Sequence, residues 1–175
     1  MSYLSRKIKR GYRLYKAKMG CWLHGRGLAY AEGALSATVH RANGEDEDLG
    51  VICRNEVTDT GVAFIVDAFQ DSAELETMKY HAAGTDNTAE DQTDTALIAE
   101  VETRGTGTTT EGATANIYKT VGTVNITATR AIVEHGVLSA SSSGTLLDRS
   151  VFSVINVDNG DSIEFTYELT LTAGG

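Results

Sequence analysis

Four histidines, His24, His40, His81 and His135, are the side chains of this sequence best suited to acid–base or metal chemistry. Nucleophilic catalysis needs such a base beside a hydroxyl or thiol, and no Gly-x-Ser-x-Gly motif accompanies them. On a strand, Glu134 and His135 face opposite sides and cannot converge on one atom. His81 and His135 could be cross-strand neighbours, but two imidazoles do not complete a metal site. We therefore expect hydrogen-bonded core or interface histidines, no catalytic residue, no metal and no other cofactor.

Two further stretches have compositions found in binding loops. Residues 43–48, Asn-Gly-Glu-Asp-Glu-Asp, offer carboxylates for Ca²⁺ or for general acid–base work. They lack the Asp-x-Asp-x-Asp-Gly spacing of a calcium loop, so we interpret them as a solvated turn. Gly105-Thr106-Gly107 is followed by no predicted helix and no Gly-Lys-Ser/Thr, which argues against phosphate-binding loops. Cys21 and Cys53 have no metal-ligand spacing, and we expect reduced thiols, with a disulfide as the alternative.

The charge of the chain is divided unequally along its length. The 175 residues carry a net charge of −9, yet residues 1–41 hold nine Lys or Arg against one acid, a net charge of +8 that leaves −17 for the remainder. Apolar residues recur between these cations at three- and four-residue spacing, which predicts an amphipathic helix. We predict a basic N-terminal arm over residues 1–50, partly helical and ending in an acidic linker loop, followed by a β-sandwich domain over residues 51–175.

This arm is the predicted binding segment. Its apolar face either packs on its own body or docks on an acidic or nucleic-acid surface with aromatic anchors. Because the remainder of the chain is poor in Lys and Arg, only the arm is suited to nucleic acid. The residues that we expect to bind a partner are Leu4, Arg6, Lys7, Ile8, Lys9, Arg10, Tyr12, Arg13, Tyr15, Lys16, Lys18 and Trp22.

The remaining residues have the pattern of an all-β domain. In residues 162–171 apolar and polar side chains alternate, which is typical of a half-buried strand. Residues 151–157 form a second β-rich run, and the Asn159-Gly160 pair between the two predicts a hairpin with a type I′ turn. The sequence has no Pro, so its turns depend on Gly, Asn, Asp and Ser. Roughly seven or eight strands at this spacing predict a β-sandwich or barrel.

Further elements follow from local patterns. Thr58 or Asp59 can cap a short helix whose apolar residues Val62, Ile65, Val66 and Phe69 should lie against the sheet or plug one end of the sandwich. Thr93 or Asp94 can cap one helical turn over residues 96–98. Residues 105–112 are predicted to be a mobile tip, and Gly122 to separate two strands by a bend or bulge. The predicted strands are residues 51–54, 78–83, 116–121, 123–128 and, at the centre of a sheet, 131–138.

Five segments of the chain share motifs with a known group of proteins, namely residues 78–85, 93–97, 134–137, 144–152 and 160–172. Taken together, these segments resemble the capsid decoration (cement) and related virion structural proteins of tailed bacteriophages. The resemblance spans about residues 55 to 175, and residues 1–50 match no part of it. It implies a jelly-roll-like β-sandwich on the virion surface, made in the host cytoplasm, forming a homotrimer and contacting the major capsid protein without catalysis.

The sequence is also compatible with other functions. A tail, neck or head-fibre adaptor would use the same domain with the arm as its attachment, and a nucleic-acid-binding protein would use the arm on phosphate. An enzyme acting on carbohydrate is a more distant alternative, for which no pair of acids stands out. The longest apolar runs are a few residues, so we expect no membrane-spanning segment and no membrane partner.

Overall fold

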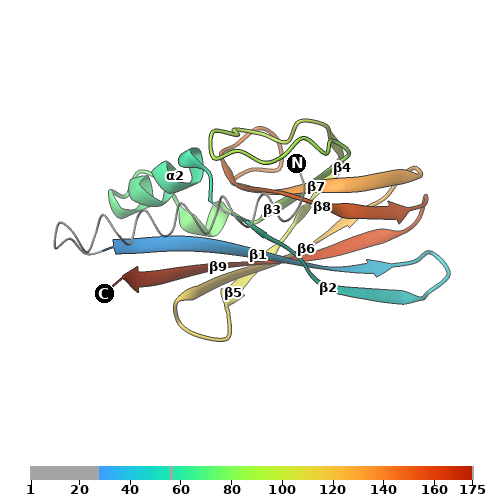
Figure 1. Cartoon of the computed structure of the whole chain (residues 1–175), viewed down its shortest axis with the longest axis horizontal. Helices are drawn as coiled ribbons and strands as arrows, with labels where there is room; N and C mark the ends of the chain where they lie inside the picture. The colour runs from blue at the N-terminus through green and yellow to red at the C-terminus, as the bar shows by residue number, and fades with distance from the viewer. Residues whose placement is uncertain (1–27, 56, 175) are drawn as a thin grey trace. The chain divides into compact units, whose positions relative to one another are not determined.

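The computed structural model describes residues 28–55 and 57–174, and most of them lie in strands (Figure 1). A five-stranded antiparallel sheet has the order β2-β1-β9-β6-β5, and a four-stranded sheet has the order β4-β3-β7-β8. This arrangement confirms the predicted all-β sandwich with short helices. The elements are β1 (Leu28–His40), β2 (Asp46–Asn55), α2 (Asp59–Phe69), the 3₁₀ helix η1 (Leu75–Thr77), β3 (Tyr80–Gly84), β4 (Glu100–Thr106), β5 (Thr108–Glu111), β6 (Ile117–Asn125), β7 (Arg130–Leu138), β8 (Leu146–Val157) and β9 (Ser162–Gly174).

The core lies between inward-facing side chains of the two sheets. On β9 the burial alternates as the sequence predicts, with Ile163, Phe165, Tyr167 and Leu169 buried. Strand β7 pairs with β3 on one side and β8 on the other, which confirms the central position predicted for residues 131–138. Residues Glu32–Thr170 form one compact unit.

The predicted hairpin of residues 151–171 is wrong. Strands β8 and β9 lie in different sheets, with β8 paired to β7 and β9 paired to β6. The connection is a turn closed by the Asp161 amide, which donates to the Asp158 carbonyl at 3.1 Å. Only Gly160 adopts a positive φ there, +93°, whereas a type I′ turn requires two such residues. The turn is a corner that carries the chain from one sheet to the other.

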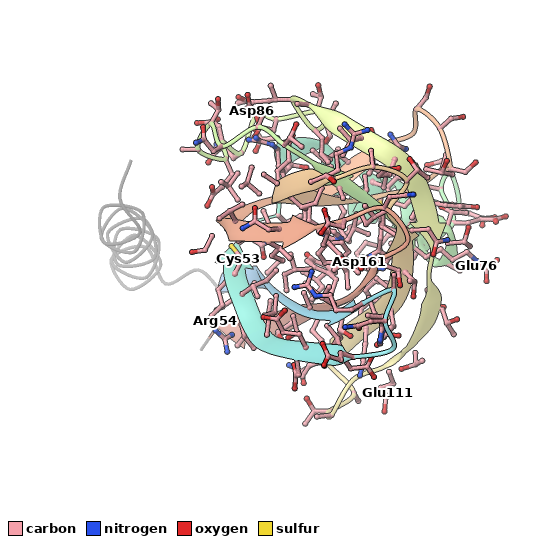
Figure 2. The ribbon with its side chains drawn as sticks, turned by 90° about the vertical axis from the view of Figure 1, so that its right-hand side faces the viewer. Cys53, Arg54, Glu76, Asp86, Glu111 and Asp161 are labelled. Carbon is pink, nitrogen blue, oxygen red and sulfur yellow. The ribbon has the colours of Figure 1, made fainter. Side chains whose placement is uncertain are left out.

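Asp161 holds this corner against the β1–β2 connection. Its carboxylate accepts hydrogen bonds from the backbone amides of Asp158 at 3.0 Å and Ala42 at 2.9 Å, and from the Arg41 guanidinium at 3.1 Å. These bonds, the one from the Asp158 amide first, lower the pKa of Asp161 despite its burial. Figure 2 shows Asp161 at this end of the sandwich, beside the β1–β2 hairpin.

The sandwich begins well before the predicted boundary at residue 50, which falls inside β2. Strand β1 pairs with β2 from Gly33 opposite Asn55 to His40 opposite Asp46. Leu35, Ala37 and Val39 of β1 are buried, so part of the segment assigned to the arm supplies core side chains. Residues 43–48 form the exposed tip and first strand residues of this hairpin, as expected for a solvated turn.

Strand β6 runs without interruption through Gly122, where the sequence predicted a bend between two strands. A Cβ atom on Gly122 would lie 2.4 Å from Cδ2 of His81 and 3.2 Å from the Cα of Gly107. The glycine is therefore required by the close approach of the His81 ring and not by a turn. Residues 105–112, predicted to be a mobile tip, are largely strand, in β4 and β5.

Replacing Gly122 with Ala should therefore destabilise the fold. The added methyl group would overlap the His81 ring, and we expect Gly122→Ala to lower the free energy of unfolding by about 1–3 kcal/mol in urea denaturation. Thr123→Ser, at the exposed next position of β6, should change it by less than about 0.5 kcal/mol. Equal stability of Gly122→Ala and the wild type would show that the His81 contact does not constrain this position.

Candidate functional site

The twelve residues predicted to bind a partner, from Leu4 to Trp22, lie outside the residues that the structure describes. The same is true of Cys21 and His24. Cys53 is half-buried on β2, with its sulfur 3.7 Å from the Val151 carbonyl oxygen. The described residues offer four other features with chemical character, which are two buried polar clusters, a buried ion pair and one exposed apolar helix.

The histidine cluster joins the two sheets. His81 on β3 lies opposite Val137, and His135 on β7 lies opposite Ala83, so the two rings are diagonal neighbours on one face. His81 Nδ1 lies 3.0 Å from His135 Nε2, and His81 Nε2 lies 3.2 Å from the hydroxyl of Thr120 on β6. The predicted cross-strand proximity is confirmed. Both rings are fully buried, and the centroid of His135 lies 4.4 Å from that of Phe165.

Hydrogen-bond accounting favours one proton arrangement in this cluster. His135 Nδ1 is buried and has no hydrogen-bond partner among the described residues. A buried N–H without an acceptor costs more than an unused lone pair, so we assign Nδ1 as unprotonated. His135 Nε2 then donates to His81 Nδ1, and His81 Nε2 donates to Thr120. Burial lowers the pKa of His81 to about 4 and holds that of His135 well below its usual range, so both rings are neutral.

Glu134 and Arg149 form a buried ion pair on the opposite face of the same sheet. The two side chains are fully buried, and Arg149 Nε lies 2.9 Å from Glu134 Oε2. Arg149 also donates to Asp94 at 3.1 Å and to the Thr88 carbonyl at 3.1 Å. The carboxylate of Glu134 accepts from the Ile98 and Ala99 amides at 3.2 and 2.8 Å, and from Asp86 N at 3.3 Å.

This network fixes the loop between β3 and β4. The amides of Ile98 and Ala99 bond to Glu134, and residues 96–98 form no helix, contrary to the helical turn predicted there. The loop is anchored by a carboxylate and a guanidinium from two neighbouring strands. The sequence signal for this role was Asp148-Arg149-Ser150, three polar residues inside the otherwise apolar and buried run Leu146–Phe152 of β8.

A second polar cluster lies between the sheets around Asp148. The Asn55 amide donates to Asp148 and Ser150, and Ser150 lies 3.1 Å from the same Asp148 oxygen. Burial raises the pKa of Asp148 well above its usual range, so this carboxyl group is neutral. Two further buried oxygens, Asn55 Oδ1 and the Tyr167 hydroxyl, have no hydrogen-bond partner among the described residues. Gly33 leaves the room for both, because its Cβ would lie 2.2 and 2.9 Å from them.

Helix α2 presents an exposed apolar face, which we call the α2 surface and define as Val62, Val66 and Phe69. These side chains are 49%, 47% and 81% exposed. The sequence predicted that this face would be buried against the sheet, and that prediction is wrong. Ile65, the fourth residue of the predicted face, is half-buried, and Gly61 is the buried residue of the helix.

The attachment of α2 explains why its face is exposed. The Thr58 side chain accepts from the Gly61 amide at 3.0 Å, which confirms the predicted N-cap, and donates to the Leu146 carbonyl at 2.8 Å. Gly61 lies so close to β8 that its Cβ would be 2.5 Å from the Leu147 carbonyl oxygen. The first turn of the helix is therefore held on β8, while the last turn, ending at Phe69, projects away from this attachment (Figure 1).

A surface depression of about 540 Å³ is lined by residues of β4, β5, β6 and β9, half of them threonines, with Lys119 and Glu164 as its charged side chains. Within residues 28–55 and 57–174, no group of three or more His, Cys, Asp or Glu could hold a metal ion. No helix in the described part of the chain is both long and apolar enough to cross a membrane.

A comparison with protein-family models gives no match, and a comparison with curated proteins gives none either.

Removing one partner of the buried ion pair should be strongly destabilising. Arg149→Leu leaves the Glu134 carboxylate buried without its cation, and we expect a loss of about 3–5 kcal/mol in the free energy of unfolding. Arg54→Leu makes the same chemical change where the pair with Glu32 is 3.6 Å long and the Arg54 side chain is 59% exposed, and should cost less than about 1 kcal/mol. Equal losses in urea denaturation would show that burial does not distinguish the two pairs.

The buried histidines predict a specific pH dependence. The folded-state pKa of His81, about 4, lies below the ordinary histidine pKa of 6.5, so the unfolded chain binds more protons between these values. Stability should therefore fall as the pH drops from 6.5 to about 4, by about 3 kcal/mol from this residue. Asp148 makes the opposite contribution, because burial raises its pKa in the folded state and folding therefore favours its protonated form as the pH falls. This contribution is common to the wild type and His81→Gln. Urea denaturation across this range should show a larger acid loss for the wild type than for His81→Gln; parallel curves would contradict the prediction.

Proposed function

We propose that this protein is a structural component of a tailed-phage virion, a capsid decoration protein that binds the major capsid protein through its basic arm and stabilises the head. The proposal includes a homotrimer on the capsid surface and no catalytic step. The observation that carries it is the division of charge, with +8 in residues 1–27 and −17 in residues 28–175. A cationic segment joined to an anionic body suits attachment to an acidic surface that the body itself does not bind.

The ion pairs of the body support this division of roles. Most of its cations are already neutralised by nearby carboxylates, so the body offers few free positive charges to an anionic partner. In contrast, residues 1–27 hold eight Lys or Arg and no Asp or Glu, so no acid lies nearby in the sequence. The arginine pairs in the body are Arg41 with Glu47 and Asp161, Arg54 with Glu32, Arg104 with Glu100, Arg130 with Glu102, and Arg149 with Glu134, Asp94 and Asp86.

The exposed surface of the body is also suited to a soluble shell protein. The tip of the β1–β2 hairpin carries Glu45, Asp46, Glu47 and Asp48, all exposed. His40 and Arg41 lie beside two of these acids, with distances of 2.7 Å to Asp46 and 2.6 Å to Glu47. Acidic residues on an outward face favour solubility and disfavour binding to nucleic acid.

Charge reversal in the arm tests this function. We expect Lys7→Glu with Arg10→Glu to weaken binding to purified particles of the parent phage about tenfold, because two attractive charges become repulsive. Lys79→Glu with Lys119→Glu changes the net charge equally but lies in the body, and should leave particle binding unchanged. Bound protein is measured by co-sedimentation at several salt concentrations.

The same variants separate the alternatives. Full occupancy of particles by the arm variant would overturn the role of the arm. Equal losses for both variants would show that net charge matters and the position of the charges does not. Binding of the wild type to duplex DNA that falls steeply with salt, without binding to particles, would favour a nucleic-acid-binding protein instead.

A further inference from the structure

The α2 surface is an apolar face for which the described residues provide no cover. Val62, Val66 and Phe69 follow one another at i, i+4 and i+7, so they form a single stripe along the helix. Phe69, at the far end of that stripe, is 81% exposed. Isolated exposed apolar residues are common, but three in one stripe that includes a large aromatic side chain mark an interaction surface.

The charges around the α2 surface define the chemistry of its partner. The sequence from residue 55 to residue 78 contains no Lys, Arg or His. The helix has no basic residue in its last turn, where the carbonyl groups create a negative pole that cations stabilise. Exposed acids on the helix and in the segment that follows it have no ion pair among the described residues; they are Asp59, Asp67, Asp71, Glu74 and Glu76. Glu76 points outward at the periphery of the molecule (Figure 2).

The way the helix ends places two of these acids close to Phe69. Asp71 adopts a left-handed conformation with φ of 57°, and the amides of Asp71 and Ser72 donate to the Ala68 and Asp67 carbonyls at 3.2 and 3.0 Å. This is a Schellman ending, with aspartate where glycine is usual. Asp67 and Asp71 therefore add negative charge to the negative end of the helix, and no cation of the described residues compensates it.

The acids near the α2 surface disfavour a second α2 surface as its partner and favour a basic segment. Two α2 surfaces packed on each other would bring like charges together, which disfavours self-association through this face. The complementary partner is a basic segment with apolar residues at helical spacing. Residues 1–27 of this chain have that composition, with eight cations, no acid and apolar residues that include Leu4, Ile8 and Tyr15.

We propose that, in solution, the α2 surface of one copy binds the basic arm, residues 1–27, of a second copy. Each copy carries one donor arm and one acceptor surface, so the contact is heterologous and copies can close into a ring. The inference rests on the arm acting as a binding segment, as in the proposed function, and gives it a second target. The two targets compete for the same arm residues.

A photo-crosslinker at position 69 identifies the occupant directly. Full-length Phe69→p-benzoylphenylalanine is mixed with an equal amount of ¹⁵N-labelled wild-type chain, irradiated without particles and analysed by mass spectrometry. We expect crosslinks from position 69 to ¹⁵N-labelled peptides of residues 1–27. The same probe at Val154, a 52% exposed position on β8, should give at least about fivefold less of this product.

Charge variants in the probe-bearing chain give a second measurement. Asp67→Lys should reduce the crosslink yield at least about threefold, while Glu111→Lys, an exposed acid on β5 with the same charge change, should leave it unchanged. Crosslinks confined to the probe-bearing chain, crosslinks to α2 of the second copy, equal yields at positions 69 and 154, or no crosslink would each overturn the proposal. Because the experiment contains no particles, these outcomes leave the particle-binding test of the proposed function independent.

Discussion

The buried ion pair between Glu134 and Arg149 is the interaction on which the four-stranded sheet and its long loop both depend. A charge without a partner in the protein interior costs several kcal/mol, so neither side chain is tolerated alone. The pair crosses from β7 to β8, and its remaining hydrogen-bonding capacity is taken by backbone groups of residues 86–99 and by Asp94. Displacing that loop would leave these ionised groups under-satisfied, which couples the order of the loop to that of the sheet.

The polar groups between the two sheets follow a different rule. His81, His135 and Asp148 have no buried countercharge, and burial shifts the pKa of each towards its neutral form. Neutral groups can be satisfied by hydrogen bonds to one another, to Thr120 and to Asn55. The glycines that face these clusters, such as Gly122, provide the space that the rings need. One face of the four-stranded sheet therefore holds an ion pair, and the other faces a neutral polar core.

Local patterns in the sequence predicted the features that short segments decide. Alternation identified β9, Thr58 identified the helix start, and opposite faces for Glu134 and His135 followed from strand geometry. Features decided by distant partners were not predictable in this way. Asn159-Gly160 is compatible with a hairpin or a corner, and pairing of β9 with β6 selects the corner. Gly122 resembles a strand break until His81 is seen against it. The residues predicted to bind a partner lie outside the described residues.

The exposure of α2 is a feature that sequence periodicity alone could not predict. A helical stripe of apolar residues states which face avoids water, but not which molecule covers it. In the compact unit, arginine charges are neutralised by carboxylates and most large apolar side chains are buried, whereas Phe69 is exposed and the acids near it have no ion pair among the described residues. An exposed apolar stripe beside acids that have no ion pair suits a partner that is both apolar and cationic. The first 27 residues of the same chain have this composition, so their charge and apolar character are complementary to those of the α2 surface.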